Sequence, residues 1–205
     1  MGQVTIIVPE IGSVEIGGKT YKTTKIGNQT WLAENLDFTW EGLSINNPNG
    51  DQYKDLACYA KLSETDYGWN GLRYGLFYNW NAKNTLATRY LPTGWRLPTN
   101  NDFQNLVNFI GSGELAFEQL RSVQFWNVGG GVDLYGFNSK GTGRFFNNYV
   151  DEFKNTWYWT TGPRTEAESA GGNAFEIKSS IKSITFDSLN GTLVRFVNIR
   201  LIKDT

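Results

Sequence analysis

The sequence predicts an α+β fold with two short helices, small antiparallel sheets and long ordered loops. Helix-forming residues are few, whereas the 23 glycines and the many Asn and Thr residues favour short strands joined by turns. A hairpin pattern opens the main part of the chain, and a capped amphipathic helix lies near its middle. The length of 205 residues suits one domain. We expect that domain over residues 13–205, after an N-terminal strand and linker over residues 1–12.

The N-terminal part of the chain has the alternation of strands. Residues 3–8 predict an edge strand that Pro9 ends. Residues 14–16 and 20–26 flank a Gly-Gly turn and predict a hairpin. Residues 29–36 predict a further strand, which buries Trp31 and Leu36.

A long polar segment, residues 37–73, predicts a loop. A loop of this length is uncommon in a compact domain unless it is ordered and functional. Its carboxylates are of the kind that bind Ca²⁺, but their spacing matches no EF-hand loop, so a solvated loop is the better interpretation. These carboxylates are Asp51, Asp55, Glu64 and Asp66.

The clearest local pattern is a capped helix after Pro98. Thr99 is a suitable N-cap, and Asp102 stands three residues later, where a capping box has its acid. Gly111 is a typical C-terminal stop. Four residues at helical spacing form one apolar face. They are Phe103, Leu106, Val107 and Ile110.

Two weaker patterns also favour helices. One covers residues 74–84, where aromatic side chains would pack it. The other covers residues 114–122, with four residues expected to point inward. They are Leu115, Ala116, Gln119 and Leu120.

The C-terminal third is predicted to return to short strands, at residues 134–138, 143–146, 156–161, 174–178, 181–186 and 194–202. Alternation in the last of these predicts one buried face made by Val197, Ile199 and Leu201. Asn198, Arg200 and Ile202 would then lie on the opposite face.

Composition excludes several classes of function. The chain has no His, which removes Ser-His-Asp and Cys-His catalysis and imidazole metal sites. The single Cys58 excludes an internal disulfide and a thiolate metal cluster, and it is expected to be a small buried apolar residue. A net charge of −1 lacks the basic footprint of a nucleic-acid-binding protein. No segment is apolar over the length needed for membrane insertion, and no signal peptide is visible. We therefore expect no cofactor, no metal and no nucleic-acid partner.

Ordered motifs along the chain resemble a known family. Residues 19–36 resemble the opening signature of the Fibrobacter succinogenes major paralogous domain. Later segments are similar to its further signatures, in order: YGLFYNW at 74–80, PTGWRLPT at 92–99, YGF at 135–137, YWTT at 158–161 and NIRLIKD at 198–204. The resemblance covers about residues 14–205. Members of this family are mostly uncharacterised and occur in surface or secreted proteins of gut bacteria and their phages.

The GWRLPT segment and the closing strand also resemble the wider C-type-lectin-like fold. That resemblance implies an α+β domain in which a hairpin joins the termini and a small sheet lies under long loops. The formylglycine-generating enzymes of this fold use paired cysteines, which a chain with one Cys does not supply. Its sugar-binding lectins use Glu-Pro-Asn or Gln-Pro-Asp and a Trp-Asn-Asp calcium site, and this sequence contains none of these tripeptides.

The variable proteins of diversity-generating retroelements share this fold, and they suggest where a binding surface would lie. The matching segment here is residues 173–198, and its alternative interpretation is an ordinary solvated face of two strands. The candidate ligand-binding residues in it are Asn173, Phe175, Ser179, Ser180, Lys182, Thr185, Asp187, Ser188 and Asn190. Surplus aromatic and polar residues nearby are typical of recognition surfaces. These add Trp157, Tyr158, Arg164, Glu166 and Phe186, although Trp157 or Trp159 is expected in the core.

The function that we expect is a non-enzymatic binding module outside the cell, at a cell surface or on a virion such as a phage tail tip. Its partner would be a protein or glycan receptor on another cell. One alternative is a structural virion or fimbrial component that forms homo-oligomers through residues 3–8. Another is a hydrolase that uses Asp151 with Glu152, or Glu166 with Glu168.

Overall fold

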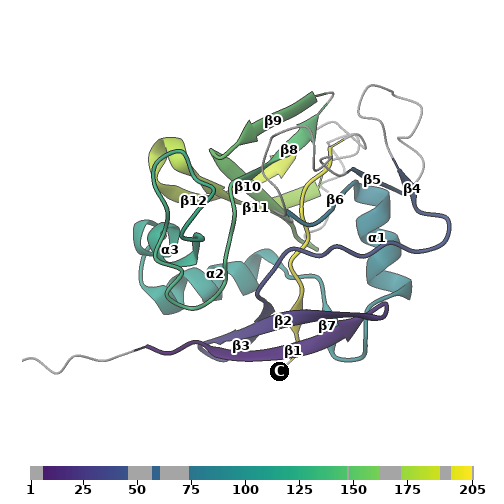
Figure 1. Ribbon diagram of the computed structural model, residues 1–205, viewed down its shortest axis with the longest axis horizontal. Coiled ribbons are helices and arrows are strands. Elements are labelled where there is room, and N and C mark those ends of the chain that lie inside the picture. Colours follow the sequence, from purple (N-terminus) through teal and green to yellow (C-terminus); the bar gives the residue numbers. More distant parts are fainter. Residues whose placement is uncertain are drawn as a thin grey trace, which may run out of the picture.

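Three α-helices and three β-sheets make up the described part of the chain (Figure 1). The computed structural model describes residues 7–45, 57–60, 74–146, 148–161, 172–189 and 195–204. This content confirms the α+β class. Among these residues, no helix has the length and apolar character needed to cross a bilayer.

The first sheet brings the two ends of the chain together. It has five strands in the order β1-β2-β3-β13-β7, and every pair is antiparallel. Its strands are β1 (Glu10–Ile16), β2 (Lys19–Ile26), β3 (Gln29–Leu32), β13 (Ile202–Lys203) and β7 (Trp95–Arg96). The predicted hairpin is therefore confirmed, with Gly17 and Gly18 at positive φ in its turn. Because β1 begins at Glu10, the expected boundary after residue 12 lies inside a strand.

The second sheet has five strands in the order β12-β11-β10-β8-β9. The pairing of β10 with β8 is parallel, and the other pairs are antiparallel. The strands are β8 (Thr142–Phe146), β9 (Asn148–Glu152), β10 (Asn155–Trp159), β11 (Gly172–Lys178) and β12 (Ser183–Leu189). The strand expected from residue 181 begins at Ser183, because Ser179–Ile181 form a 3₁₀ turn that Lys182 ends in the left-handed region.

A third, small sheet joins β4 (Ser44–Ile45), β5 (Cys58–Ala60) and β6 (Phe77–Tyr78) in that order. The expected strand at residues 134–138 is instead a turn. The Asp133 carboxylate accepts a hydrogen bond from the Asn138 backbone N–H at 2.6 Å, and its carbonyl accepts one from the Gly136 N–H at 3.1 Å. An Asp that binds the following backbone favours a turn over a strand.

Helix α2 (Asn100–Ile110) has the predicted caps and the predicted buried face. Thr99 Oγ1 accepts from the Asp102 N–H at 3.1 Å, and the Asp102 carboxylate accepts from the Thr99 N–H at 2.7 Å. This is a capping box. Gly111 ends the helix at a φ of 123°. In Figure 1 the helix lies between the two five-stranded sheets.

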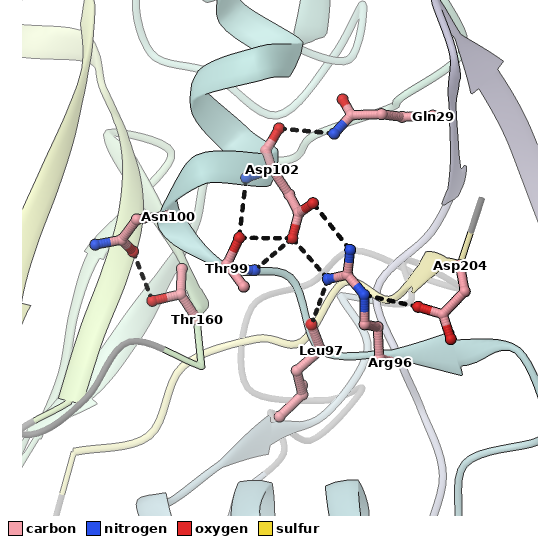
Figure 2. A network of polar contacts seen from close by, with 8 residues as sticks. All are labelled: Gln29, Arg96, Leu97, Thr99, Asn100, Asp102, Thr160 and Asp204. Carbon is pink, nitrogen blue, oxygen red and sulfur yellow. Dashed lines mark hydrogen bonds and ion pairs between the residues drawn. The ribbon is translucent and has the colours of Figure 1, made fainter.

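A network of polar contacts ties the start of α2 to the first sheet (Figure 2). The Arg96 guanidinium donates to both oxygens of Asp102, at 2.6 and 3.0 Å, and its Nε donates to Asp204 at 2.8 Å. Gln29 Nε2 donates to the Asp102 carbonyl at 3.0 Å. Burial alone raises the pKa of Asp102, but hydrogen bonds from Arg96 and Thr99 outweigh it, so the pKa of this carboxyl is lowered.

The other two helices differ in detail from the expected ones. Helix α1 (Trp80–Arg89) begins later than residue 74, because residues 77–78 form β6 and the Asn79 side chain caps the helix, accepting from the Ala82 N–H at 2.9 Å. In helix α3 (Gly113–Leu120) the buried residues are Ala116, Phe117 and Leu120. The inward position expected for Leu115 is wrong, since this side chain is 47% exposed.

The C-terminal segment was expected to bury one face, but the structure buries both. It passes through the interior, and residues 196–198 form only single bridges to three different segments. Asn198 and Arg200 are buried as completely as Val197 and Ile199.

Distant partners satisfy these buried polar groups. The Arg200 guanidinium donates to Asn35 Oδ1 at 2.7 Å and to the carbonyl oxygens of Leu32, Phe137 and Asn138 at 2.9, 2.5 and 3.1 Å. Such a set of acceptors allows a cation to be buried.

Candidate functional site: a polar basin on the second sheet

The two faces of the second sheet differ in chemistry. One face packs against α2, through residues such as Tyr158 and Phe175. On the other face, cross-strand pairing places Trp157 beside Glu176, and Glu176 beside Thr185. Residues paired across strands share a face, so these three side chains form one row. Arg144 extends the row on β8, with its guanidinium carbon 4.3 Å from the centre of the Trp157 ring.

This row forms the floor of a basin of about 750 Å³, a volume that suits a small ligand or part of a larger one. We call it the polar basin. Polar residues supply most of its lining, from the second sheet, the turn between β9 and β10, the 3₁₀ turn and the segment between α3 and β8. They are Asn127, Arg144, Asp151, Lys154, Asn155, Glu176, Lys178, Ser179, Ser180 and Thr185. Val128, Trp157 and Phe186 complete it.

The floor of the basin is fixed by hydrogen bonds. The Glu176 side chain is only 5% exposed, and its carboxylate accepts from Thr185 Oγ1 at 2.8 Å and Asn155 Nδ2 at 3.3 Å. Asn155 Oδ1 in turn accepts from the Ser179 backbone N–H at 3.2 Å. A buried carboxylate requires such partners. As a result, Asn155 connects the floor to the 3₁₀ turn that carries Ser179 and Ser180.

The charges of the basin favour a partner with anionic or hydrogen-bond-accepting groups. Three cations, Arg144, Lys154 and Lys178, face two carboxylates, Asp151 and Glu176. Since Glu176 is buried and accepts hydrogen bonds from within the protein, its charge is less available to a ligand than those of exposed Lys154 and half-buried Lys178. The rim therefore has an excess of positive charge.

Part of the predicted ligand-binding set meets here. Ser179, Ser180 and Thr185 line the basin, together with Phe186. Lys182 lines an adjoining cavity of about 630 Å³, which shares Ser179 and Ser180 with the basin. Asn173 is half-buried in β11 and does not line either cavity.

The ligand-binding role predicted for two residues is wrong, because both side chains belong to the core. Tyr158 and Phe175 are fully buried. The Phe175 ring stacks on Phe103 of α2 with centroids 4.0 Å apart, and the Tyr158 hydroxyl lies 2.9 Å from Ser139 Oγ. Alternation along β10 and β11 turns both toward the helix.

For the remaining predicted residues the structure describes no side chain. Arg164, Glu166 and Asn190 lie outside the described residues, as do Asp51, Asp55, Glu64 and Asp66 of the long loop. For Asp187 and Ser188 the structure gives the backbone pairing in β12, opposite Ala174 and Asn173.

Sequence reasoning missed several basin residues. The sequence could have indicated Glu176 and Lys178, because alternation in the predicted strand 174–178 places them on the face opposite Phe175 and Ile177. Arg144 had none, because its place depends on the parallel pairing of β8 with β10.

The carboxylates considered for hydrolysis are separated in the structure. Asp151 lines the basin, whereas neighbouring Glu152 accepts a hydrogen bond from the Tyr74 hydroxyl at 3.3 Å. Burial raises the pKa of Glu152, and the bond from Tyr74 opposes this rise. Glu166 and Glu168 lie outside the described residues. In the part of the chain that the structure covers, no group of three or more His, Cys, Asp or Glu residues could hold a metal ion.

Comparisons with known proteins give one match. The family model described as Fibrobacter succinogenes major domain matches residues 24–203, which is most of the chain. Comparison with curated proteins and with solved structures found no match.

Proposed function

The chain belongs to the Fibrobacter succinogenes major domain family, and we propose that this member is a non-enzymatic binding module. It lies at a bacterial cell surface or a phage tail tip and recognises a protein or glycan receptor on another cell. The observation that carries the proposal is the polar basin, which gathers cations and hydroxyls on the sheet face that does not pack against α2.

We also infer that the fold is C-type-lectin-like. The support is the topology: strands from the N-terminal and C-terminal parts of the chain share the first sheet, and the second sheet follows the three helices in sequence. In Figure 1 the second sheet lies on the far side of α2 from the first sheet. Such a fold would present the second sheet to a partner.

The basin combines a fixed floor with adaptable rim groups, which suits recognition. Hydrogen bonds through Asn155 and Glu176 hold the floor before any ligand arrives, so little ordering is required on binding. Ser180 and Lys154 at the rim are exposed and can adjust their hydrogen bonds to a partner.

Glycan and protein arrays probed with the purified protein test the proposal. We expect selective binding that Lys178→Glu weakens at least about tenfold, since it reverses a charge at the rim. Lys22→Glu is the matched control, because Lys22 is exposed on β2 of the first sheet. A folded protein that binds nothing on either array, or whose binding is indifferent to both variants, would contradict the proposal.

A second proposed function is assembly through the N-terminal part of the chain. Residues 3–6 of the strand expected at 3–8 lie outside the described residues, and residues 7 and 8 are not in a strand, so this proposal rests on the exposed edge of the first sheet. β1 is an edge strand, and Glu10 to Ser13 are all exposed. Unpaired strand edges readily pair with another chain. Sedimentation of the full chain and of a variant that lacks residues 1–12 tests this, because the truncation removes most of the exposed part of β1. If both are monomers, the assembly proposal fails.

A further inference from the structure

An apolar hollow of about 480 Å³ lies next to the polar basin, and the two share Asn127. We call it the aromatic hollow. It is lined by Phe125, Trp126 and Phe153, with the amide side chains of Gln124 and Asn127. No charged residue lines it among the described ones.

The backbone at the aromatic hollow is strained. Phe125 and Phe153 have φ angles of 72° and 59°, in the left-handed region that bulky side chains rarely occupy. Residues held in such conformations gather at binding and active sites, where the surrounding structure fixes them. Both rings are only half-buried, so part of each ring is accessible to a partner, although the Phe125 ring also packs against Tyr74 with centroids 6.2 Å apart.

Hydrogen bonds around Gly141 hold the two strained loops together. Its N–H donates to the Phe125 carbonyl at 3.2 Å, and its carbonyl accepts from the Phe153 N–H at 2.7 Å. The Phe153 carbonyl accepts from the Asn127 N–H at 2.7 Å. A Cβ at position 141 would lie 2.6 Å from the Phe125 carbonyl oxygen, so glycine permits this approach. The backbone that carries the two rings is therefore held in place before anything binds.

The chemistry of the two neighbouring sites identifies the kind of partner. The aromatic hollow offers apolar surface and two amides, which suits a large apolar side chain. A sugar ring carries several hydroxyls and would meet only the two amides of Gln124 and Asn127 there, so an apolar side chain matches the lining better. Lys154 follows Phe153 directly and lines the basin, where cations are in excess. The complementary ligand has an apolar group beside an acidic one.

We propose that the aromatic hollow is an anchor pocket for a protein partner, and that it receives a large apolar side chain whose acidic neighbour lies at the rim of the polar basin. This proposal rests on the binding function proposed above and names the ligand class. Buried aromatic or aliphatic anchors in such pockets dominate the affinity of many interfaces.

Selection of a random displayed peptide library on the purified full chain tests this proposal. We expect the enriched peptides to share a large apolar residue close to Asp or Glu. Phe153→Asn should lower their affinity at least tenfold. Asn tolerates the left-handed backbone better than Phe, so this variant removes the ring without adding strain. Phe125→Asn is a second variant of the same design.

The matched control is Phe109→Ala, which removes a ring that is 55% exposed on α2 and contacts Tyr135. It should leave peptide affinity unchanged. Peptides that lose affinity with Lys178→Glu but not with Phe153→Asn would overturn the anchor pocket and leave the basin function standing. Binding of acidic glycans with no enriched peptide would overturn the protein partner. Binding of neither class would overturn both proposals.

Discussion

Lys83 should make the protein less stable at neutral pH than a variant with an apolar residue in its place. The side chain is 2% exposed on α1, and its Nζ lies 3.2 Å from the centre of the Trp80 ring. Its nearest recorded acceptor, the Thr160 carbonyl oxygen, is 3.5 Å away, which is long for a hydrogen bond. Burial lowers the pKa of Lys83 from 10.5 to about 7.

The size of the effect follows from these values. A fall of this size in pKa corresponds to at most about 5 kcal/mol of unfavourable free energy in the folded state. Lys83→Met removes the charge with a side chain one atom shorter, and should therefore raise the free energy of unfolding by several kcal/mol, at most about 5 kcal/mol, at pH 6.

The sign of the pH dependence is fixed by the lowered pKa. Below about pH 7 Lys83 is charged in both the folded and unfolded states, so the full penalty is present. Between the folded and unfolded pKa values only the unfolded chain holds the proton, so the wild type gains stability as pH rises. The advantage of Lys83→Met should therefore shrink above pH 7, by up to about 1.4 kcal/mol per pH unit.

Urea unfolding of both proteins from about pH 6 to about pH 9.5 measures this difference. Lys22→Met, at an exposed position, is the control and should differ little from the wild type at any pH. An advantage of Lys83→Met that stays constant over this range would refute the lowered pKa. A loss of stability in this variant would refute the argument that the buried charge is unfavourable.

Two further predictions concern buried polar networks. Asp102→Ala removes the capping box and the ion pair with Arg96, and should lower the free energy of unfolding by about 2 kcal/mol at pH 7. The pKa of Asp102 is lower in the folded protein than in the unfolded chain, where it is near 3.9. The stabilisation that Asp102 provides is therefore present above that unfolded value and is lost as the pH falls through the folded value. In urea unfolding, the stability difference between wild type and Asp102→Ala should be smaller near pH 3 than at pH 7. Arg200→Met leaves the carbonyls of Leu32 and Phe137 without their donor, and should cost about 3–5 kcal/mol in the same assay; a cost below about 1 kcal/mol would contradict a structural role for Arg200.

Local signals explain what the sequence predicted well. The caps of α2 depend on Thr99, Asp102 and Gly111, which act within a few residues of one another. The hairpin depends in the same way on the Gly17-Gly18 turn. Propensity and pattern report on such short-range interactions directly.

Contacts between segments far apart in the chain explain where the predictions from the sequence were wrong. Asn198 and Arg200 look like an exposed strand face, but segments far along the chain supply their hydrogen bonds. Tyr158 and Phe175 look available for a ligand, but α2 covers them. For the basin, the candidates Ser179, Ser180 and Thr185 came from a family resemblance, while Arg144 reached it through a parallel pairing that no local pattern signals.

A crystal structure of the protein with a ligand selected on the arrays is the most direct test of the central claim. We expect the ligand to lie on the second sheet, with its acidic or hydrogen-bonding groups near Lys178 and Ser180 in the polar basin. A ligand bound instead to the first sheet, with the basin left untouched, would contradict it.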